Sequence, residues 1–379
     1  MLEPTPAAAA DPAAAVLVCL DFGDPAYEEG VEEVVRLAES AGARRYELVR
    51  GRRVRPDPKL YAGSGKVAEI GRAAEAINAG FVIFNHALSP AQERNLERVL
   101  KRRVMDRTEL ILEIFAQRAQ TTEGKLQVEL ARLEHLSTRL VRGWTHLERQ
   151  RGGLSKTGGP GEKQIELDRR YIAQRVRVLR AKLDELRRRR TVQRRARARR
   201  EVLSISLVGY TNAGKSTLFN ALTHAGAYAA DQLFATLDTT TRRVYLPEAG
   251  KLVVSDTVGF IRDLPHTLVA AFRATLEETI HADLLLHVVD ASSATRDQQI
   301  EEVNKVLAEI GAADIPQIIV WNKIDVNGLA AGVDRDEYGK ISRVRLSAAT
   351  GEGVQFMRLA LAEAAAKTAA NHPEPQPIL

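Results

Sequence analysis

The strongest constraint on the fold of this chain is one glycine-containing stretch, Gly209-Tyr210-Thr211-Asn212-Ala213-Gly214-Lys215-Ser216-Thr217. It follows the apolar run 202–208, which we expect to be a buried strand, and precedes an apolar helical pattern at 218–222. Strand, glycine loop and helix are the context of a phosphate-binding loop, because curled backbone N–H groups and a helix N-terminus then point at one place. An ordinary glycine turn before a helix is the alternative, and the motifs that follow argue against it.

Four more motifs follow in the order expected of a guanine-nucleotide-binding domain, each beside a predicted strand. They are Phe234-Ala235-Thr236-Leu237-Asp238, Asp256-Thr257-Val258-Gly259, Asn322-Lys323-Ile324-Asp325 and Ser347-Ala348-Ala349. Each motif alone is weak. Together with the first stretch, they predict that the chain binds GTP and GDP through these residues.

Each motif has a chemical role in such a site. Lys215 would reach the β and γ phosphates, while the hydroxyls of Ser216 and Thr236 would ligate Mg²⁺. Asp256 would hold Mg²⁺ through water, and the Gly259 N–H would meet the γ phosphate.

Selection of the base falls to the last two motifs. The Asp325 carboxylate can accept hydrogen bonds from N1–H and N2–H of guanine, which adenine does not offer. A backbone N–H within 347–349 can meet guanine O6.

Two positions concern hydrolysis. Phe260 stands where GTPases of the Ras type carry a water-orienting glutamine, so unassisted hydrolysis should be slow and activation must come from elsewhere. Asn212 belongs to an N-x-G-K-[ST] loop, and in some GTPases of this form the asparagine helps hold K⁺ beside the phosphates. A purely loop-stabilising role for Asn212 is an equal alternative.

Charge is unevenly distributed along the chain. The net charge is +6, but residues 101–200 hold 28 lysines and arginines against 12 aspartates and glutamates, a net of +16. A basic body between two acidic ones predicts a polyanionic partner, of which nucleic acid is the leading candidate. The single cysteine, Cys19, allows no internal disulfide, and no apolar run reaches membrane-spanning length. We therefore expect a cytoplasmic monomer without stable membrane insertion, with peripheral membrane attachment left open.

The alternation of strand and helix patterns predicts an α/β protein in which a small α/β subdomain and an antiparallel helical hairpin precede a P-loop GTPase domain. Its expected parts are a disordered tail (1–14), the subdomain (15–106), the basic hairpin (107–200), the GTPase domain (201–366) and a C-terminal tail (367–379). In the subdomain we expect strands at 16–20, 46–49 and 81–84, helices at 27–41 and 65–79, and a capping box at Ser89-Pro90-Ala91-Gln92. In the GTPase domain we expect strands at 202–208, 243–246, 252–256, 284–289, 317–321 and 342–346, in a mostly parallel sheet.

The hairpin prediction depends on two apolar seams. These are Leu126, Leu130, Leu133, Leu136 and Leu140, and then Ile172, Val176, Leu179, Leu183 and Leu186. The glycine-rich stretch 151–162 between them should be a loop, and nine arginines follow between 187 and 200. We expect a flexible basic tip that becomes ordered on RNA. The candidate contacts are Arg151, Lys156, Lys163, Arg187, Arg188, Arg189 and Arg190.

A second glycine–lysine turn occurs in the N-terminal part, at Gly63-Ser64-Gly65-Lys66. Val67 stands where a phosphate loop needs Ser or Thr, and the first glycine of the pattern is absent. A plain turn before a helix is therefore favoured over a second nucleotide site.

The chain resembles the HflX family of ribosome-associated GTPases over roughly residues 15–366. Besides the GTPase motifs, the similar stretches are 56–66, 88–96, 144–149, 158–162 and 168–170. Two positions depart from the family pattern, since Lys163 replaces a usual Thr and Thr239 a usual Pro, and only a short tail stands where an extra C-terminal domain is allowed. The resemblance implies binding to the large ribosomal subunit and its RNA, splitting of stalled ribosomes, and a hairpin loop directed toward the peptidyl-transferase region.

The leading hypothesis is thus a Mg²⁺-dependent GTPase that associates with the large ribosomal subunit and splits or rescues stalled ribosomes. An RNA-remodelling NTPase that also uses the turn at 63–66 is the runner-up, and ATP hydrolysis by residues 1–200 would favour it. A non-enzymatic RNA adaptor is a third class, against which intact Lys215, Ser216, Thr236 and Asp325 argue.

Overall fold

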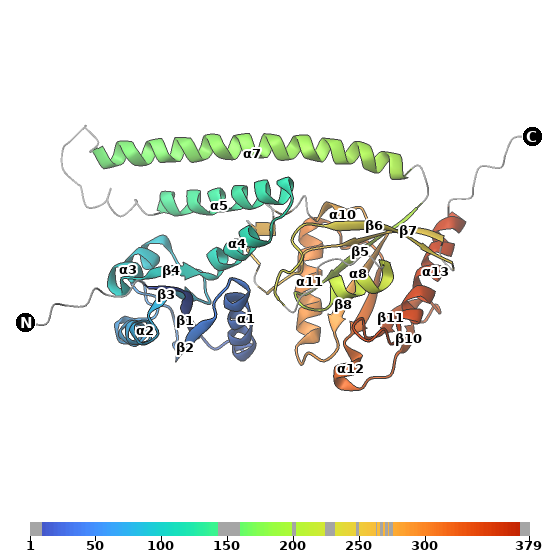
Figure 1. Cartoon of the computed structure of the whole chain (residues 1–379), viewed down its shortest axis with the longest axis horizontal. Helices are drawn as coiled ribbons and strands as arrows, with labels where there is room; N and C mark the ends of the chain where they lie inside the picture. Colours follow the sequence, from blue (N-terminus) through green and yellow to red (C-terminus); the bar gives the residue numbers. More distant parts are fainter. Residues whose placement is uncertain are drawn as a thin grey trace, which may run out of the picture. The chain divides into compact units, whose positions relative to one another are not determined.

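The computed structural model describes residues 10–142, 160–198, 202–223, 232–247, 250–262, 264–265, 268–269, 272 and 276–371 (Figure 1). The chain divides into two compact units. The first is Met1–Gln117 with Glu129–Val178, and the second is Arg118–Val128 with Leu179–Leu379. Within the described ranges, none of the helices combines the length and apolarity needed to cross a membrane.

The first unit contains a four-stranded parallel sheet in the order β2-β1-β3-β4. Its strands are β1 (Asp11–Asp21), β2 (Arg45–Arg52), β3 (Ala79–Phe84) and β4 (Arg103–Asp106), and its helices are α1 (Tyr27–Ser40), α2 (Ser64–Ala76), α3 (Pro90–Leu100) and α4 (Arg107–Arg118). Residues 14–20 are all buried, as expected for a strand with neighbours on both sides. The three predicted strands and two predicted helices are confirmed, although α2 ends at Ala76 and residue 79, which the helix prediction included, begins β3. The disordered tail is wrong for residues 11–14, which begin β1.

The capping box at the start of α3 is confirmed. Ser89 Oγ accepts from the Gln92 N–H at 3.3 Å, and the Ser89 N–H donates to Gln92 Oε1 at 2.9 Å. Pro90 takes the first helical position, where its missing N–H costs nothing.

Two long helices, α5 (Thr122–Arg142) and α7 (Pro160–Ala198), correspond to the predicted hairpin. In the first unit they meet at an ion pair of Glu129 with Arg175, at 2.7 Å. The predicted loop is wrong at 160–162, which already belong to α7, and helix α4 was not anticipated.

The first predicted seam is rotated from the face that is buried. On α5 the buried positions are 124, 127, 128, 130 and 131, whereas Leu136 is 45% exposed. Gly124 and Gln127 take helix positions that leucine spacing alone assigned to the surface. In the second seam, Ile172, Leu179 and Leu183 are buried as expected.

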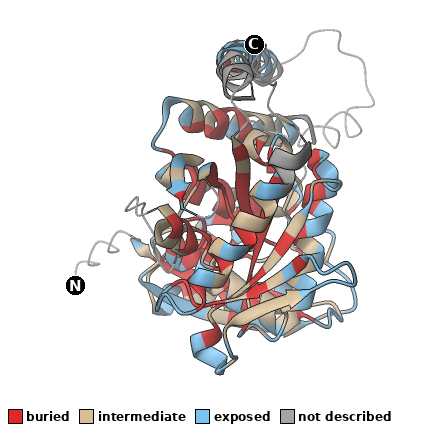
Figure 2. Ribbon diagram, turned by 90° about the vertical axis from the view of Figure 1, so that its right-hand side faces the viewer, coloured by how far each residue is buried: buried red, intermediate tan, exposed pale blue. Residues whose placement is uncertain are grey.

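The second unit is built on a seven-stranded sheet in the order β10-β11-β9-β8-β5-β7-β6, and Figure 2 shows buried residues concentrated along the strands. The strands are β5 (Leu203–Gly209), β6 (Thr240–Leu246), β7 (Gly250–Asp256), β8 (Leu284–Asp290), β9 (Gln317–Asn322), β10 (Gly332–Arg335) and β11 (Ile341–Arg345). The helices are α8 (Lys215–Thr223), α10 (Glu277–Ile280), α11 (Arg296–Ile310), α12 (Ile324–Asn327) and α13 (Val354–Asn371).

Among the described strands of this sheet, only the two edge pairs, β10 with β11 and β6 with β7, are antiparallel. The predicted mostly parallel sheet and its six strands are confirmed, and the short edge strand β10 is an addition. The carboxyl ends of parallel strands share one edge of a sheet, where ligands bind in such folds. The motifs that follow β5, β7 and β9 are therefore brought together there.

Candidate active site

The loop between β5 and α8 is held in a conformation that only certain residues permit. Gly209 and Gly214 have φ of +147° and +93°, and Asn212 has φ of +61°. A Cβ at Gly209 would overlap the Val288 carbonyl, and one at Gly214 would overlap Asn322 Nδ2. Both glycines are thus required for the close approach of the loop to β8 and β9.

Lys215 is the buried cation of the site, and its pKa is shifted strongly from the ordinary value. Its side chain is buried, and its Nζ donates to the Tyr210 carbonyl at 2.8 Å and the Gly209 carbonyl at 3.2 Å. Burial lowers the pKa of Lys215 to about 8, although the charge of Asp256 acts in the opposite direction. A buried ammonium held by two neutral carbonyls remains short of negative charge, which phosphate oxygens can supply.

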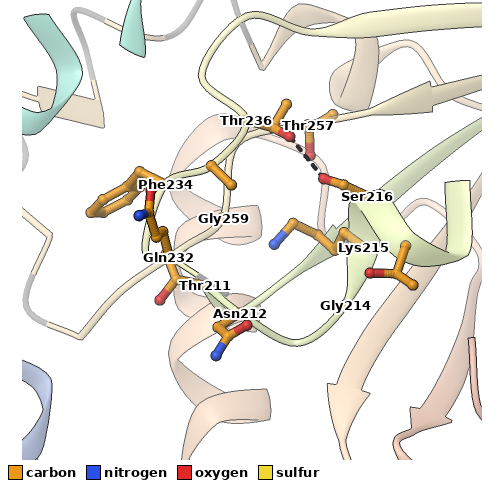
Figure 3. Close-up of a pocket in the computed structure, with 12 residues that line it drawn as sticks. Thr211, Asn212, Gly214, Lys215, Ser216, Gln232, Phe234, Thr236, Thr257 and Gly259 are labelled. Carbon is orange, nitrogen blue, oxygen red and sulfur yellow. Dashed lines mark hydrogen bonds between the residues drawn. The ribbon is translucent and has the colours of Figure 1, made fainter. Parts of the chain in front are cut away.

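Three oxygen-bearing side chains converge beside the lysine, and two of them, Ser216 and Thr236, are drawn in Figure 3. Ser216 Oγ lies 2.8 Å from Thr236 Oγ1, and the two hydroxyls donate to Asp256 Oδ2 at 2.6 and 3.1 Å. Burial raises the pKa of Asp256, while its hydrogen bonds and the charge of Lys215 oppose that shift. Among the described residues, Asp256 Oδ1 is buried without a hydrogen-bond partner. An all-oxygen set with a spare carboxylate oxygen fits Mg²⁺, which prefers hard ligands and keeps several waters.

A pocket opens in front of these groups (Figure 3). Eleven of the residues predicted from the sequence line it: Thr211, Asn212, Gly214, Lys215, Ser216, Thr217, Phe234, Ala235, Thr236, Thr257 and Gly259. The twelfth, Gln232, was missed because it precedes the recognisable motif by two residues and belongs to no pattern.

The strand β7 leads into a segment that is pinned to the phosphate loop. The backbone of Phe260 pairs with Gly209 and Thr211 at 3.1 and 2.7 Å, and its side chain is only 1% exposed. The Tyr210 hydroxyl accepts from the Arg262 N–H at 2.8 Å. Phe260 is therefore held in the core and cannot take over the water-orienting role of a glutamine.

Asn322 links the phosphate loop to the loop after β11. Its Nδ2 donates to the Ala213 carbonyl at 2.9 Å, and its Oδ1 accepts from the Ala348 N–H at 2.8 Å. Lys323 pairs with Asp290 at 2.7 Å. Burial opposes ionisation of Asp290, but Lys323 and Ser292 outweigh it and lower the pKa of that carboxyl.

The expected base-reading carboxylate belongs to Asp325, which is exposed and is the second residue of α12. The loop that contains Ser347 and Ala348 is held beside Asn322, because the Ala348 N–H donates to Asn322 Oδ1.

Some predicted site residues point elsewhere. Leu237, Val258 and Ile324 are buried apolar side chains, and the Asp238 carboxylate accepts from the backbone N–H groups of 120 and 121. Of the predicted RNA contacts, Arg188 and Arg189 are exposed on α7. Arg151 and Lys156 lie outside the described residues, as do the side chains of Lys163, Arg187 and Arg190.

Comparisons with known proteins agree with this arrangement. Three family models match consecutive parts of the chain: GTP-binding GTPase N-terminal over 28–116, GTP-binding GTPase Middle Region over 118–197, and 50S ribosome-binding GTPase over 204–323. The chain is similar to the GTPase HflX of Escherichia coli (strain K12), with 53% identity over 94% of this chain and 84% of that protein. It is also 50% identical to the GTPase HflX of Magnetococcus marinus, over 86% of this chain and 75% of that one.

A solved structure, described as the SsGBP and GDP complex, matches with a TM-score of 0.52 and 26% identity, covering 93% of this chain and 98% of that one. The family models and the relatives span both the N-terminal parts and the P-loop domain. The glycine loop, its buried lysine and the surrounding strand-end motifs thus belong to a GTP-binding and GTP-hydrolysing domain, and the chain is a member of the HflX family of GTPases.

Proposed function

We propose that this GTPase associates with the large ribosomal subunit through its RNA, and that it splits or rescues stalled ribosomes. The observation that carries the proposal is the match of residues 204–323 to the 50S ribosome-binding GTPase family, joined to a strongly basic central segment. A ribosomal partner would place the protein in the cytoplasm.

The proposed chemistry at the site follows its geometry. Lys215 would neutralise the β and γ phosphates, and the Ser216 and Thr236 hydroxyls would bind Mg²⁺ in place of their present bonds to Asp256. Asp256 would then hold the ion through water. When bound, Mg²⁺ would offset the charge that develops on the phosphate oxygens.

Reading of the base would fall to Asp325, with the 347–349 loop held by Asn322 against guanine O6. We expect Asp325→Asn to shift preference from GTP toward xanthosine triphosphate by on the order of 100-fold or more, since an amide donor then faces the base. Competition between the two nucleotides for a fluorescent GTP analogue measures this ratio. An unchanged preference would remove Asp325 from the base site.

The trigger for hydrolysis would come from the partner. The side chain of Phe260 is buried and its backbone is paired with the phosphate loop, so no glutamine-like group follows Gly259. Asn212, beside the phosphates at a positive φ, would help hold K⁺. Contact with the ribosome would then complete the site and switch the protein toward release.

The exposed arginines of α7 would supply the salt-dependent attraction to RNA. Arg169, Arg170, Arg188 and Arg189 are exposed along this helix. Each phosphate contact makes binding fall more steeply with salt. The glycine-rich tip preceding Pro160, outside the described residues, would act at the peptidyl-transferase region.

The test is GTP turnover with and without purified large subunits, combined with gradient sedimentation of intact ribosomes at two salt concentrations. Replacing 152–159 by a short Gly/Ser turn should abolish splitting while GTP affinity stays intact. Neutralising 187–190 should weaken subunit binding more and flatten its salt dependence. If large subunits leave the turnover rate unchanged, the ribosomal proposal is wrong. If the turn-replaced chain splits ribosomes normally, the tip is only a connector.

A further inference from the structure

The carboxylate of Asp238 is bound by the turn that precedes α5. Its Oδ2 accepts from the Gln120 N–H at 2.7 Å and the Thr121 N–H at 2.9 Å, and its Oδ1 accepts from the Thr121 hydroxyl. All of these residues belong to the second unit. A carboxylate is well placed there, because these two N–H groups lie just before the N-terminal end of α5, which carries partial positive charge.

Thr121 has two roles in this arrangement. Its Oγ1 accepts from the Gly124 N–H at 2.9 Å and its carbonyl accepts from the Lys125 N–H at 3.0 Å, which makes it the N-cap of α5. The same hydroxyl donates to Asp238. A valine at 121 would keep the shape and remove both bonds.

Gly124 is what allows Asp238 to come so close. A Cβ at this position would overlap Asp238 Oδ1, and Gly124 is itself buried. Glycine is a poor residue for a helix, so its presence in the first turn of α5 is explained by this contact and not by helix stability.

A second contact holds the other end of the segment 232–238. Arg118 Nη2 donates to Gln232 Oε1, and Gln232 lines the pocket. The segment 232–238 is therefore held at both ends by residues 118–121, while Thr236 between them reaches Ser216 and Asp256. Leu237, the residue between Thr236 and Asp238, is 2% exposed, and its packing restricts movement of this part of the backbone.

We propose that Thr121, through Asp238, is a positioning residue for GTP hydrolysis, supplied by the segment before α5, far in sequence from the phosphate loop but in the same unit: it holds the 232–238 segment so that Thr236 can ligate Mg²⁺ when a γ phosphate is present. The inference rests on the proposed role of Thr236. Two residues span about 7 Å at most, so Thr236 moves within a radius that the Asp238 anchor sets. Without the Asp238 anchor, the 232–238 segment must become ordered when a triphosphate binds, and this weakens triphosphate binding. Binding of a diphosphate does not require the segment to be ordered, so it should not change.

The experiment compares the dissociation constants of a fluorescent GDP and a fluorescent non-hydrolysable GTP analogue, in the full chain and over a Mg²⁺ titration. Thr121→Val should weaken the GTP analogue about tenfold, equivalent to one lost charge-assisted hydrogen bond. It should also raise the Mg²⁺ requirement and leave GDP binding unchanged. Thr121→Ser keeps the hydroxyl and should restore both.

Gly124→Ala tests positioning while the Thr121 hydroxyl is still present. Its Cβ would overlap Asp238 Oδ1 but would lie 3.2 Å from Thr121 Oγ1, so it displaces Asp238 far more than the cap and should reproduce the Thr121→Val result, although alanine favours the helix. Ser89→Ala, which removes the cap of α3 in the other unit, is the matched control and should change neither constant. If Gly124→Ala keeps the wild-type ratio of the two constants, the positioning role is overturned, even where Thr121→Val is too unstable to measure.

Thr236→Ala distinguishes this failure from failure of the proposed site. If Thr236→Ala loses the preference for the GTP analogue and the Thr121 and Gly124 variants keep it, only the anchor is wrong. If Thr236→Ala also keeps the preference, Thr236 is not the Mg²⁺ ligand, and the inference falls together with that assignment.

Discussion

In the part of the chain that the structure describes, the glycine–lysine turns at 63–66 and 209–215 both open helices, and their surroundings differ. Gly63 precedes α2 with φ of +78°, and Gly214 precedes α8 with φ of +93°. Each turn is followed within three residues by a lysine. Locally the two are alike, so the difference lies in what the rest of each unit places around them.

The two lysines have opposite environments. Lys66 donates to the Arg50 carbonyl at 2.8 Å and pairs with Glu69 at the same distance, so its charge is already compensated. Lys215 is buried and donates to two backbone carbonyls, while the Asp256 carboxylate accepts from two hydroxyls. A phosphate gains most from a cation that is desolvated and short of negative charge.

The glycines differ in the same sense. A Cβ at Gly63 would overlap the Arg53 guanidinium, which donates to the Ala62 carbonyl at 2.6 Å. At Gly214 the neighbour is Asn322, which belongs to another strand-end motif. The motif-bearing strand ends, more than the glycine turn itself, distinguish a phosphate loop from a helix start.

The largest expected effect compares the two lysines directly. Lys215→Met should weaken GTP binding by about 4 kcal/mol, or about 1,000-fold, because it removes the buried cation that faces the phosphates. Lys66→Met should change GTP affinity by less than about threefold, since a single weak surface pair is lost. Calorimetric titration gives both numbers. A wild-type stoichiometry of two nucleotides per chain that falls to one in Lys66→Met would erase the distinction.

The next effect concerns stability against pH in the absence of nucleotide. The pKa of Lys215 is about 8 in the folded chain against 10.5 unfolded, so between these values the unfolded chain binds more protons. The free energy of unfolding should therefore rise with pH through this window, by up to about 3 kcal/mol. Urea unfolding should show Lys215→Met more stable than wild type at pH 7, with the gap closing toward pH 10. A gap that is constant with pH would mean that the ammonium is not desolvated.

Glycine replacements should separate folding from binding. Gly63→Ala and Gly214→Ala both place a side chain at a positive φ, and each should lower the free energy of unfolding by about 2 kcal/mol. Only Gly214→Ala should also reduce GTP affinity, because its Cβ would displace the Asn322 amide. Urea unfolding and nucleotide titration on the same samples test this. Equal losses of affinity in both variants would contradict it.

The smallest effect is that of the monovalent cation. Replacing K⁺ by Na⁺ should slow GTP hydrolysis about tenfold, or about 1.4 kcal/mol, if Asn212 helps hold K⁺ beside the phosphates. Asn212→Ala should then show the same slow rate in both salts. Equal wild-type rates in K⁺ and Na⁺ would leave Asn212 with a loop-stabilising role only.

Local patterns predicted much of the fold and most of the pocket. Strand positions were recognisable because buried parallel strands read as short apolar runs, and Ser89 with Gln92 was recognisable because a capping box is local. Eleven pocket residues were predicted because their motifs follow β5 and β7 or precede β6. Gln232 could not be found in this way, since only the path of the chain brings it to the pocket.

The sequence by itself determined where most of the strands lie along the chain, together with the phosphate loop and its accompanying motifs, because these depend on short-range periodicity and on residue chemistry at fixed spacing. Tertiary structure alone decided which face of α5 is buried, that Lys66 is compensated while Lys215 is not, and that Asp238 turns away from the pocket to the residues before α5. These outcomes depend on partners as far as 118 residues away in the chain, and no local pattern encodes the distance between such partners.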